Sequence, residues 1–350
     1  MNQNHSLVWF NFYSKEAPSI RYRATYLLDH LKEFHGITFE HLTPSKNKRV
    51  ILRFLWLILC LLTTKKQNIV VIQRVSAFGW YSRTLKLLVK KTRNKHCFFY
   101  DLDDAIYEEM ADDSQIRWFM EQVHQVVVGS EELRQYALKF NPNSHIITTA
   151  VVPTKRMTTI SSDSLFTIGF IGCFWGTHYQ NMRDFVMPAL CKVDFPVVLE
   201  IIGAEKPLER QLTRDYFQNT NVTVVFKHIQ NWFDESEINT AMCHWQLGLA
   251  PLHDTVVCRA KSAFKVKQYL NLGIPAVSTR IGENQVFIQD KENGFLFDDS
   301  DQLAELITYY GSLSTEERIV FSKSAKASSQ PFQLEKVAKQ WMNLIASQQQ

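Results

Sequence analysis

The 350-residue sequence lacks the cysteine patterns that identify zinc-binding and disulfide-rich proteins. Its six cysteines form no C-x-x-C pair and lie mostly in apolar segments, at positions 60, 97, 173, 191, 243 and 258. This scatter is typical of reduced core cysteines in a cytosolic protein. The polar start, MNQNHS, leads directly into an apolar strand, so we expect no secretory signal.

The sequence also lacks an apolar run long enough to cross a bilayer. The longest run, residues 50–62, is interrupted by Arg53 and is well short of the ~20 residues that a spanning helix needs. Lys48, Arg49, Lys65 and Lys66 flank it. The run predicts either a helix packed on a sheet or an interfacial helix on an anionic membrane surface. A strand-like segment follows at once, which favours the packed helix.

No strong charge excess is present, since the formal net charge is +4 and the isoelectric point is about 8.6. A mildly basic chain suits anionic ligands or an anionic membrane surface, and we expect no nucleic-acid partner.

Apolar strands and amphipathic helices alternate along both halves of the chain. Predicted strands in the first half are 7–13, 38–42, 69–73, 96–101, 125–129 and 145–148, and in the second half 166–172, 197–203, 222–226, 246–251, 275–279 and 295–297. Strict alternation with nearly continuous apolar strands predicts parallel sheets covered by helices on both faces. The fold class is therefore α/β, with two doubly wound, Rossmann-like domains.

A segment rich in threonine and serine divides the chain. We predict a first domain at 1–150, a linker at 151–164, a second domain at 165–330 and a C-terminal helix within 331–350 that crosses back to the first domain.

Polar residues follow the predicted strands of the first domain, where ligands of parallel sheets bind. Ser19 is predicted to cap a helix that carries two arginines. The candidate contacts to phosphate or hydroxyl groups of a ligand are Ser19, Arg21, Arg23, Arg74, Asp103 and Asp104. For the arginines, a solvated basic face is an equal alternative. For the aspartates, the alternatives are helix capping and a metal-binding Asp-x-Asp motif. We expect no metal at this site.

The second domain opens with a glycine-bearing turn between a strand and a helix. Gly172, Gly176 and Thr177 lie in this turn, and glycines there allow the backbone to approach a diphosphate at a helix N-terminus.

The stretch 258–279, CRAKSAFKVKQYLNLGIPAVST, combines a basic start, an apolar stripe, a Gly273-Ile-Pro275 break and a strand. The stripe of Ala263, Val266, Tyr269 and Leu270 predicts the buried face of a helix at 262–272, whereas Lys261, Lys265 and Lys267 project in other directions. The stretch resembles the donor-binding signature of GT-B glycosyltransferases of the retaining, group-one type, in which a helix ending in Gly-x-Pro follows the donor loop.

This resemblance implies two domains that face a cleft, the first binding the acceptor and the second binding a nucleotide-sugar. Because the nucleotide-sugar is a substrate, we expect no cofactor. It implies catalysis by Lys261 and Lys265 and makes the six candidate contacts of the first domain contacts to acceptor or sugar hydroxyls. It implies donor binding by Gly172, Gly176, Thr177, Ile229, Gln230, Ser262 and Gln268. Two glutamates common in this group are replaced by Ala260 and Gln268.

The expected function is sugar transfer to a glycan or polyprenol-linked acceptor in bacterial surface polysaccharide synthesis, in the cytoplasm or at the inner membrane face. Two alternatives stay open: a catalytically inactive GT-B scaffold that binds glycan or a partner protein, and a sugar-nucleotide epimerase.

Overall fold

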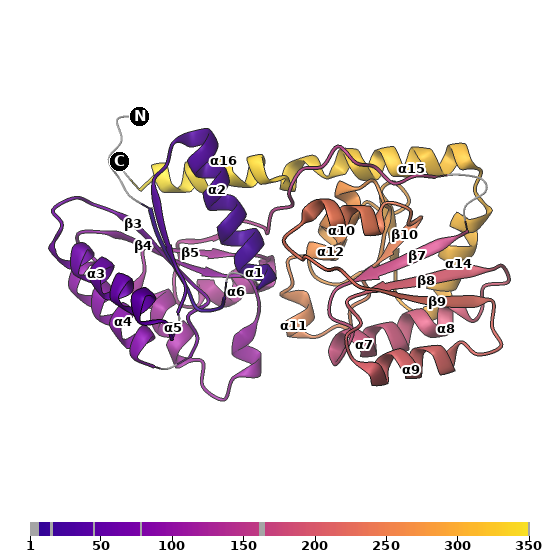
Figure 1. The fold of residues 1–350 in the computed structure, drawn as a ribbon, viewed down its shortest axis with the longest axis horizontal. Helices are drawn as coiled ribbons and strands as arrows, with labels where there is room; N and C mark the ends of the chain where they lie inside the picture. The colour runs from indigo at the N-terminus through magenta and orange to yellow at the C-terminus, as the bar shows by residue number, and fades with distance from the viewer. Residues whose placement is uncertain (1–6, 15–16, 45, 78, 161–164, 349–350) are drawn as a thin grey trace. The chain divides into compact units, whose positions relative to one another are not determined.

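The chain forms two compact units. The computed structural model describes residues 7–14, 17–44, 46–77, 79–160 and 165–348 (Figure 1). Unit 1 comprises residues 1–150, 259–262 and 332–350, and unit 2 comprises residues 151–258 and 263–331. The first six residues of the predicted first domain and residues 161–164 of the predicted linker lie outside the described residues.

Unit 1 contains a parallel sheet whose strand order is β2-β1-β3-β4-β5-β6 among the described residues. The strands are β1 Leu7–Asn11, β2 Phe39–Leu42, β3 Ile69–Gln73, β4 Cys97–Leu102, β5 Gln125–Val128 and β6 Ser144–Ile146. The carboxyl ends of all of them therefore lie along one edge.

Helices cover both faces of this sheet. They are α1 Pro18–Ile20, the π-helical η1 Arg21–Thr25, α2 Tyr26–His35, α3 Lys48–Thr63, α4 Trp80–Thr92, the 3-10 helix η2 Ile106–Glu109, α5 Ser114–Gln122, α6 Glu131–Leu138 and α16 Leu334–Ala346. On one face α16 packs beside α2, with the rings of Trp9 and Trp341 5.2 Å apart. On the other face, the ring centroids of Phe54 of α3 and Phe10 of β1 are 5.7 Å apart. These contacts bury the apolar strands on both sides.

Unit 2 repeats the architecture, with strand order β12-β11-β10-β7-β8-β9, again parallel. The strands are β7 Thr167–Ile171, β8 Val197–Ile202, β9 Val222–Lys227, β10 Leu247–Leu249, β11 Ala276–Thr279 and β12 Gly294–Phe297. The helices are α7 Thr177–Asn181, η3 Met182–Val186 (π-helical), α8 Met187–Leu190, α9 Pro207–Tyr216, α10 Glu235–Met242, α11 Val256–Arg259, α12 Phe264–Asn271, α13 Asn284–Phe287, α14 Ser300–Ser312, α15 Thr315–Ser328 and η4 Gln330–Phe332 (3-10). Two doubly wound α/β units confirm the predicted fold class.

Glycines in two strands of unit 2 make room for large aromatic side chains. A β-carbon at Gly169 of β7 would lie 1.9 Å from the indole of Trp245, and one at Gly248 of β10 would lie 2.4 Å from the ring of Tyr269. Both aromatic side chains are fully buried. The Tyr269 hydroxyl accepts a hydrogen bond from the Ile171 backbone and donates one to the Leu249 carbonyl, which fixes α12 across β7 and β10.

A buried carboxylate also holds this face together. Glu200 of β8 accepts hydrogen bonds from the Trp245 indole at 2.8 Å and from His244 at 3.0 Å, and forms an ion pair with Lys227 at 2.8 Å. Burial raises the pKa of Glu200, but these three partners outweigh it and lower the pKa below its ordinary value of 4.5.

Helix α3 is apolar on two opposite faces. Phe54, Leu57, Ile58 and Leu61 are buried, which confirms the prediction of a helix packed on the sheet. Leu52, Leu55, Trp56 and Leu59, with the same spacing, are exposed. In the part of the chain that the structure describes, none of the helices combines the length and apolar composition needed to span a membrane.

Three local predictions near the candidate sites are wrong. Ser19 does not cap a helix, because α1 begins at Pro18 and Ala17 is its N-cap residue. The helix of the 258–279 stretch begins at Phe264, because Ala263 adopts a left-handed conformation with φ 53°. Lys267 does not project outward, since its side chain is fully buried, with Nζ 5.0 Å from the centroid of the Phe287 ring.

Replacing Gly169 by alanine should unfold unit 2 more easily, because the new methyl group overlaps the fully buried Trp245 ring. We expect a loss of about 3 kcal/mol in the free energy of unfolding, measured by urea denaturation. The control is Gly79→Ala, where the backbone is extended and a β-carbon meets nothing within 4 Å. That change should cost at most about 1 kcal/mol. Equal effects of the two variants would contradict the packing argument.

Replacing Glu200 by glutamine should destabilise the protein in a pH-dependent way. Because the folded-state pKa of Glu200 is depressed, its ionised form stabilises the fold above the ordinary carboxyl value of 4.5, and that stabilisation is lost as the pH falls through the depressed pKa. The wild-type protein should exceed Glu200→Gln in unfolding free energy at neutral pH, and the difference should narrow in acid. A difference independent of pH would show that the charge of Glu200 contributes nothing.

Candidate functional site

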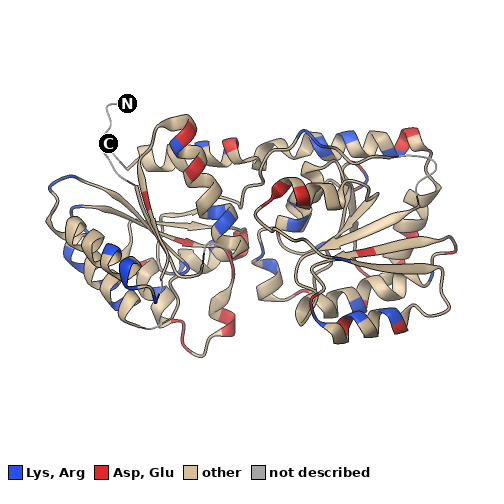
Figure 2. Ribbon diagram, in the orientation of Figure 1, with Lys and Arg blue, Asp and Glu red and all other residues tan. Residues whose placement is uncertain are grey.

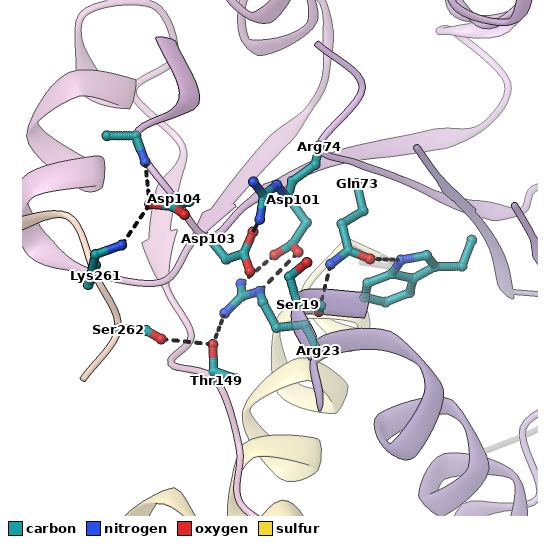
Figure 3. Close-up of polar contacts among 12 residues, drawn as sticks. Ser19, Arg23, Gln73, Arg74, Asp101, Asp103, Asp104, Thr149, Lys261 and Ser262 are labelled. Carbon is teal, nitrogen blue, oxygen red and sulfur yellow. Dashed lines mark hydrogen bonds and ion pairs between the residues drawn. The ribbon is translucent and has the colours of Figure 1, made fainter. Parts of the chain in front are cut away.

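A buried ion pair organises the carboxyl edge of the unit 1 sheet (Figure 3). Arg23 of η1 forms a bidentate pair with Asp101 of β4, and the Nε–Oδ2 distance is 3.0 Å. Its remaining guanidinium nitrogen donates to the Ile147 carbonyl at 2.9 Å and to the Thr149 hydroxyl at 3.3 Å. All the nitrogens of Arg23 are thus engaged by the protein itself, which makes this arginine a positioning residue rather than a direct ligand contact.

Asp101 stabilises the positive charge of Arg23. Burial lowers the pKa of Arg23, but the charge of Asp101 and its hydrogen bonds outweigh burial and raise the pKa above the ordinary value. Arg23 therefore carries its positive charge in the folded protein.

Arg74 lies next to this pair, directly after β3. Its backbone adopts φ 52°, a left-handed conformation that costs a non-glycine residue roughly 1–2 kcal/mol. The backbone N–H donates to the Asp101 carbonyl at 3.0 Å. In the side chain, Nη1 lies 3.2 Å from Oδ1 of Asp103, and Cζ lies 4.9 Å from the centroid of the Tyr13 ring. Its Nε is buried and has no hydrogen-bond partner among the described residues. This arginine is therefore strained and incompletely bonded, as residues at functional sites often are.

The segment Arg259–Ser262 belongs to unit 1, although the predicted second domain includes it. Ser130, whose side chain caps α6, also donates to the Ala260 carbonyl at 2.8 Å. The Ser262 hydroxyl donates to Thr149 at 3.1 Å, and Lys261 Nζ lies 4.0 Å from Asp104 (Figure 3). These contacts bring Lys261 to the same edge as Arg74.

Residues 101–104 have the sequence DLDD, and each of the three aspartates in this DLDD motif faces a cation of the chain. Asp101 pairs with Arg23, Asp103 with Arg74, and Asp104 lies near Lys261 while accepting from the Ala105 backbone. Neutralised carboxylates of this kind suit hydroxyl recognition.

Of the other two predicted unit 1 contacts, Ser19 lies beside this cluster, and Arg21 packs against Tyr22. The Ser19 carbonyl accepts a hydrogen bond from Gln73 at 3.3 Å, so its backbone is placed by the end of β3 (Figure 3). Arg21 is buried, and its guanidinium lies over the ring of Tyr22, with 4.7 Å between Cζ and the ring centroid.

In unit 2, Lys265 lies against the glycine turn that follows β7. A β-carbon at Gly172 would lie 2.9 Å from Cε of Lys265, and Nζ lies 5.4 Å from the centroid of the Phe170 ring. Gly172 has φ 126° and its N–H donates to the Ile202 carbonyl. The turn therefore needs glycine both for its backbone conformation and for the space that the lysine occupies.

The remaining predicted donor contacts surround this turn or the end of β9. Gly176, with φ 56°, is the N-cap residue of α7, and Thr177 is the first residue of that helix and is exposed. Ile229 is buried after β9, and the Gln230 N–H donates to Glu237 at 2.7 Å. Gln268 lies on α12, one turn after Lys265, and is half-buried.

Three residues of the unit 1 cluster were not predicted as part of a site: Asp101, Thr149 and Tyr13. Asp101 had a signal, since it ends a buried strand and begins the DLDD motif. Thr149 and Tyr13 had none, because their roles depend on contacts with residues more than sixty positions away.

Comparison with known proteins identifies similarity to glycosyltransferases. Residues 166–310, which make up most of unit 2, match the family model of glycosyl transferases group 1. No curated protein sequence matches the chain.

Solved structures of glycosyltransferases match over the full length. HepE of Anabaena, in complex with UDP and glucose, is 14% identical with a TM-score of 0.67, covering 98% of this chain and 100% of HepE. A glycosyltransferase from Rickettsia africae is 13% identical with a TM-score of 0.70, covering 98% of both chains. Sucrose-phosphate synthase of Thermosynechococcus elongatus is 11% identical with a TM-score of 0.67, covering 98% of this chain and 99% of that one. At these identities the structural matches establish the fold.

Replacing Asp101 by asparagine should strongly destabilise unit 1, because it leaves the buried Arg23 charge without its counter-ion. We expect a loss of about 3–5 kcal/mol in unfolding free energy, measured by urea denaturation. The control is Glu40→Gln, which removes the exposed Arg53–Glu40 pair and should cost less than about 1 kcal/mol. A small effect of Asp101→Asn would show that the cluster does not depend on this pair.

Proposed function

We propose that this chain is a group 1 glycosyltransferase that transfers a sugar from a nucleotide-sugar donor to a glycan or polyprenol-linked acceptor, with retention of configuration. We further propose a role in bacterial surface polysaccharide synthesis at the cytoplasmic face of the membrane. The observation that carries the proposal is the position of Lys265 over Gly172, inside the family-matched segment.

Lys265 is the cation that we propose to bind the donor diphosphate. Gly172 leaves room for the lysine against the turn, and the lysine supplies the positive charge that a diphosphate requires. When the bond between the sugar and the diphosphate breaks, negative charge grows on the leaving phosphate. A cation fixed at this position stabilises that charge more than the ground state, which accelerates the step.

Lys261 is the second proposed catalytic cation, and it belongs to unit 1. Asp104 holds it at 4.0 Å, longer than a hydrogen bond, so the ammonium group retains donors for a ligand. The neighbouring Ser262 is proposed to act as a donor contact.

The proposed retaining reaction needs no basic side chain. The acceptor hydroxyl attacks the anomeric carbon on the face that the diphosphate leaves, its proton passes to the leaving phosphate oxygen, and the new glycosidic bond replaces the bond to phosphate. Arg74, Asp103 and Asp104 are proposed to orient the acceptor or the sugar, because Arg74 Nε is a buried donor without a partner among the described residues. Retention is tested by the anomeric configuration of the product.

Replacing Lys265 by alanine should lower the turnover of the donor by about 10²–10³-fold, because the charge on the leaving diphosphate loses a fixed cation. Turnover is measured as release of the nucleoside diphosphate, starting with UDP-sugars, since HepE was solved with UDP and glucose. Lys192→Ala is the matched control, because this exposed lysine of unit 2 pairs with Asp301 and should not affect turnover. Wild-type turnover in Lys265→Ala would remove this lysine from the mechanism.

Lys261→Ala is measured in the same assay and should also reduce turnover with the fold intact. Thermal shift with UDP-, GDP-, TDP- and CMP-sugars then separates the alternatives. Stabilisation by one donor class without any turnover would favour an inactive scaffold, whereas conversion of the donor sugar without acceptor or hydrolysis would favour an epimerase.

A further inference from the structure

Helix α3 carries an apolar surface that the fold leaves uncovered. Leu52, Leu55, Trp56 and Leu59 are 66%, 46%, 59% and 58% exposed, and they form a continuous stripe at i, i+3, i+4 and i+7. We call this stripe the exposed α3 face. Four large apolar side chains side by side in water are costly, whereas single exposed ones are common. The buried residues of α3 already satisfy its packing on the sheet, so the exposed α3 face is not needed for the fold.

Positive charge surrounds this face. Residues 41–100 contain 13 lysines and arginines and no aspartate or glutamate. Lys48 and Arg49 lie at the start of α3, and Lys65 and Lys66 follow its end, all exposed. Exposed Arg83, Lys90 and Lys91 lie on α4, which packs beside α3 (Figure 2). Of the α3 arginines, Arg53 is paired with Glu40.

We propose that the exposed α3 face binds an anionic lipid bilayer. Leucines and a tryptophan enter the interface between headgroups and acyl chains, and the flanking cations contact lipid phosphates. Charge complementarity favours this partner over a second copy of the chain, because a symmetric dimer through this face would bring two clusters of positive charge together. The inference rests on the proposed function, since a polyprenol-linked acceptor would lie in such a bilayer.

The test is cosedimentation of the full chain with phosphatidylcholine vesicles that contain phosphatidylglycerol, without donor or acceptor. Leu55→Glu with Leu59→Glu should weaken binding by about tenfold or more, because two apolar side chains no longer enter the bilayer. The matched control is Leu208→Glu with Leu212→Glu on α9, where the two leucines are also four positions apart and are 65% and 44% exposed. This control should bind as the wild type does.

The charge component is tested separately. Lys65→Glu with Lys66→Glu should weaken binding by about tenfold, and the matched control Lys155→Glu with Arg156→Glu, another exposed adjacent pair, should not. Vesicles of phosphatidylcholine alone should bind much less wild-type protein, and high salt should reduce binding to the anionic vesicles. Circular dichroism and the melting temperature should be unchanged in all variants, because every substituted side chain is exposed.

Several results would overturn the proposal: no sedimentation of the wild type with anionic vesicles, equal binding to neutral vesicles, or unchanged binding of the α3 variant. A wild-type dimer that Leu55→Glu with Leu59→Glu converts to a monomer would assign the face to a second copy instead. Vesicle binding without donor turnover would refute the proposed enzymatic function alone, whereas donor turnover without vesicle binding would refute only the membrane contact.

Discussion

The ion pair between Arg23 and Asp101 is the constraint on which the rest of unit 1 depends. Asp101 fixes Arg23 at the carboxyl edge of the sheet, and Arg23 then fixes the Ile147 carbonyl and the Thr149 hydroxyl. Thr149 in turn accepts from Ser262, which holds the segment Arg259–Ser262 in place. A single buried charge thus links the first helical segment, the sheet and a segment more than two hundred residues away. Because a buried ion pair is costly to break on one side only, this chain of contacts is maintained as a unit.

The alternation of strands and helices was predictable because each element carries its own pattern. Parallel strands are buried on both faces and are therefore continuously apolar, and the helices between them show a 3.6-residue period. Gly273, with φ 71°, ends α12 as predicted, because only a glycine takes that conformation without strain. These signals are local, so a single sequence suffices to find them. The two-unit α/β architecture follows from counting them.

The site was less predictable because its chemistry depends on long-range partners. Arg23 and Asp101 are 78 positions apart, and the sequence alone could not distinguish a buried pair from a solvated basic face. Lys267 shows a different failure: it lies four positions after Ala263 and three before Leu270, on the apolar stripe itself, so the helical period places it inside. Its position on the helix, and not its charge, therefore determines where the side chain of Lys267 lies. The start of α12 was misplaced for a third reason, since no propensity indicates a left-handed alanine at 263.

That left-handed residue determines how the two candidate catalytic lysines are supported. In a helix starting at Ser262, Lys261 and Lys265 would lie at the end of one helix and depend on the same packing. With Ala263 at φ 53°, Lys261 is instead held by the polar contacts of Ala260 and Ser262 in unit 1, whereas Lys265 is held by α12 against Gly172 in unit 2. Each lysine therefore takes its position from its own unit. A substitution that loosens the Arg23–Asp101 network should disturb Lys261 and leave the position of Lys265 unchanged, because the Gly172 turn and the Tyr269 hydrogen bonds do not involve that network.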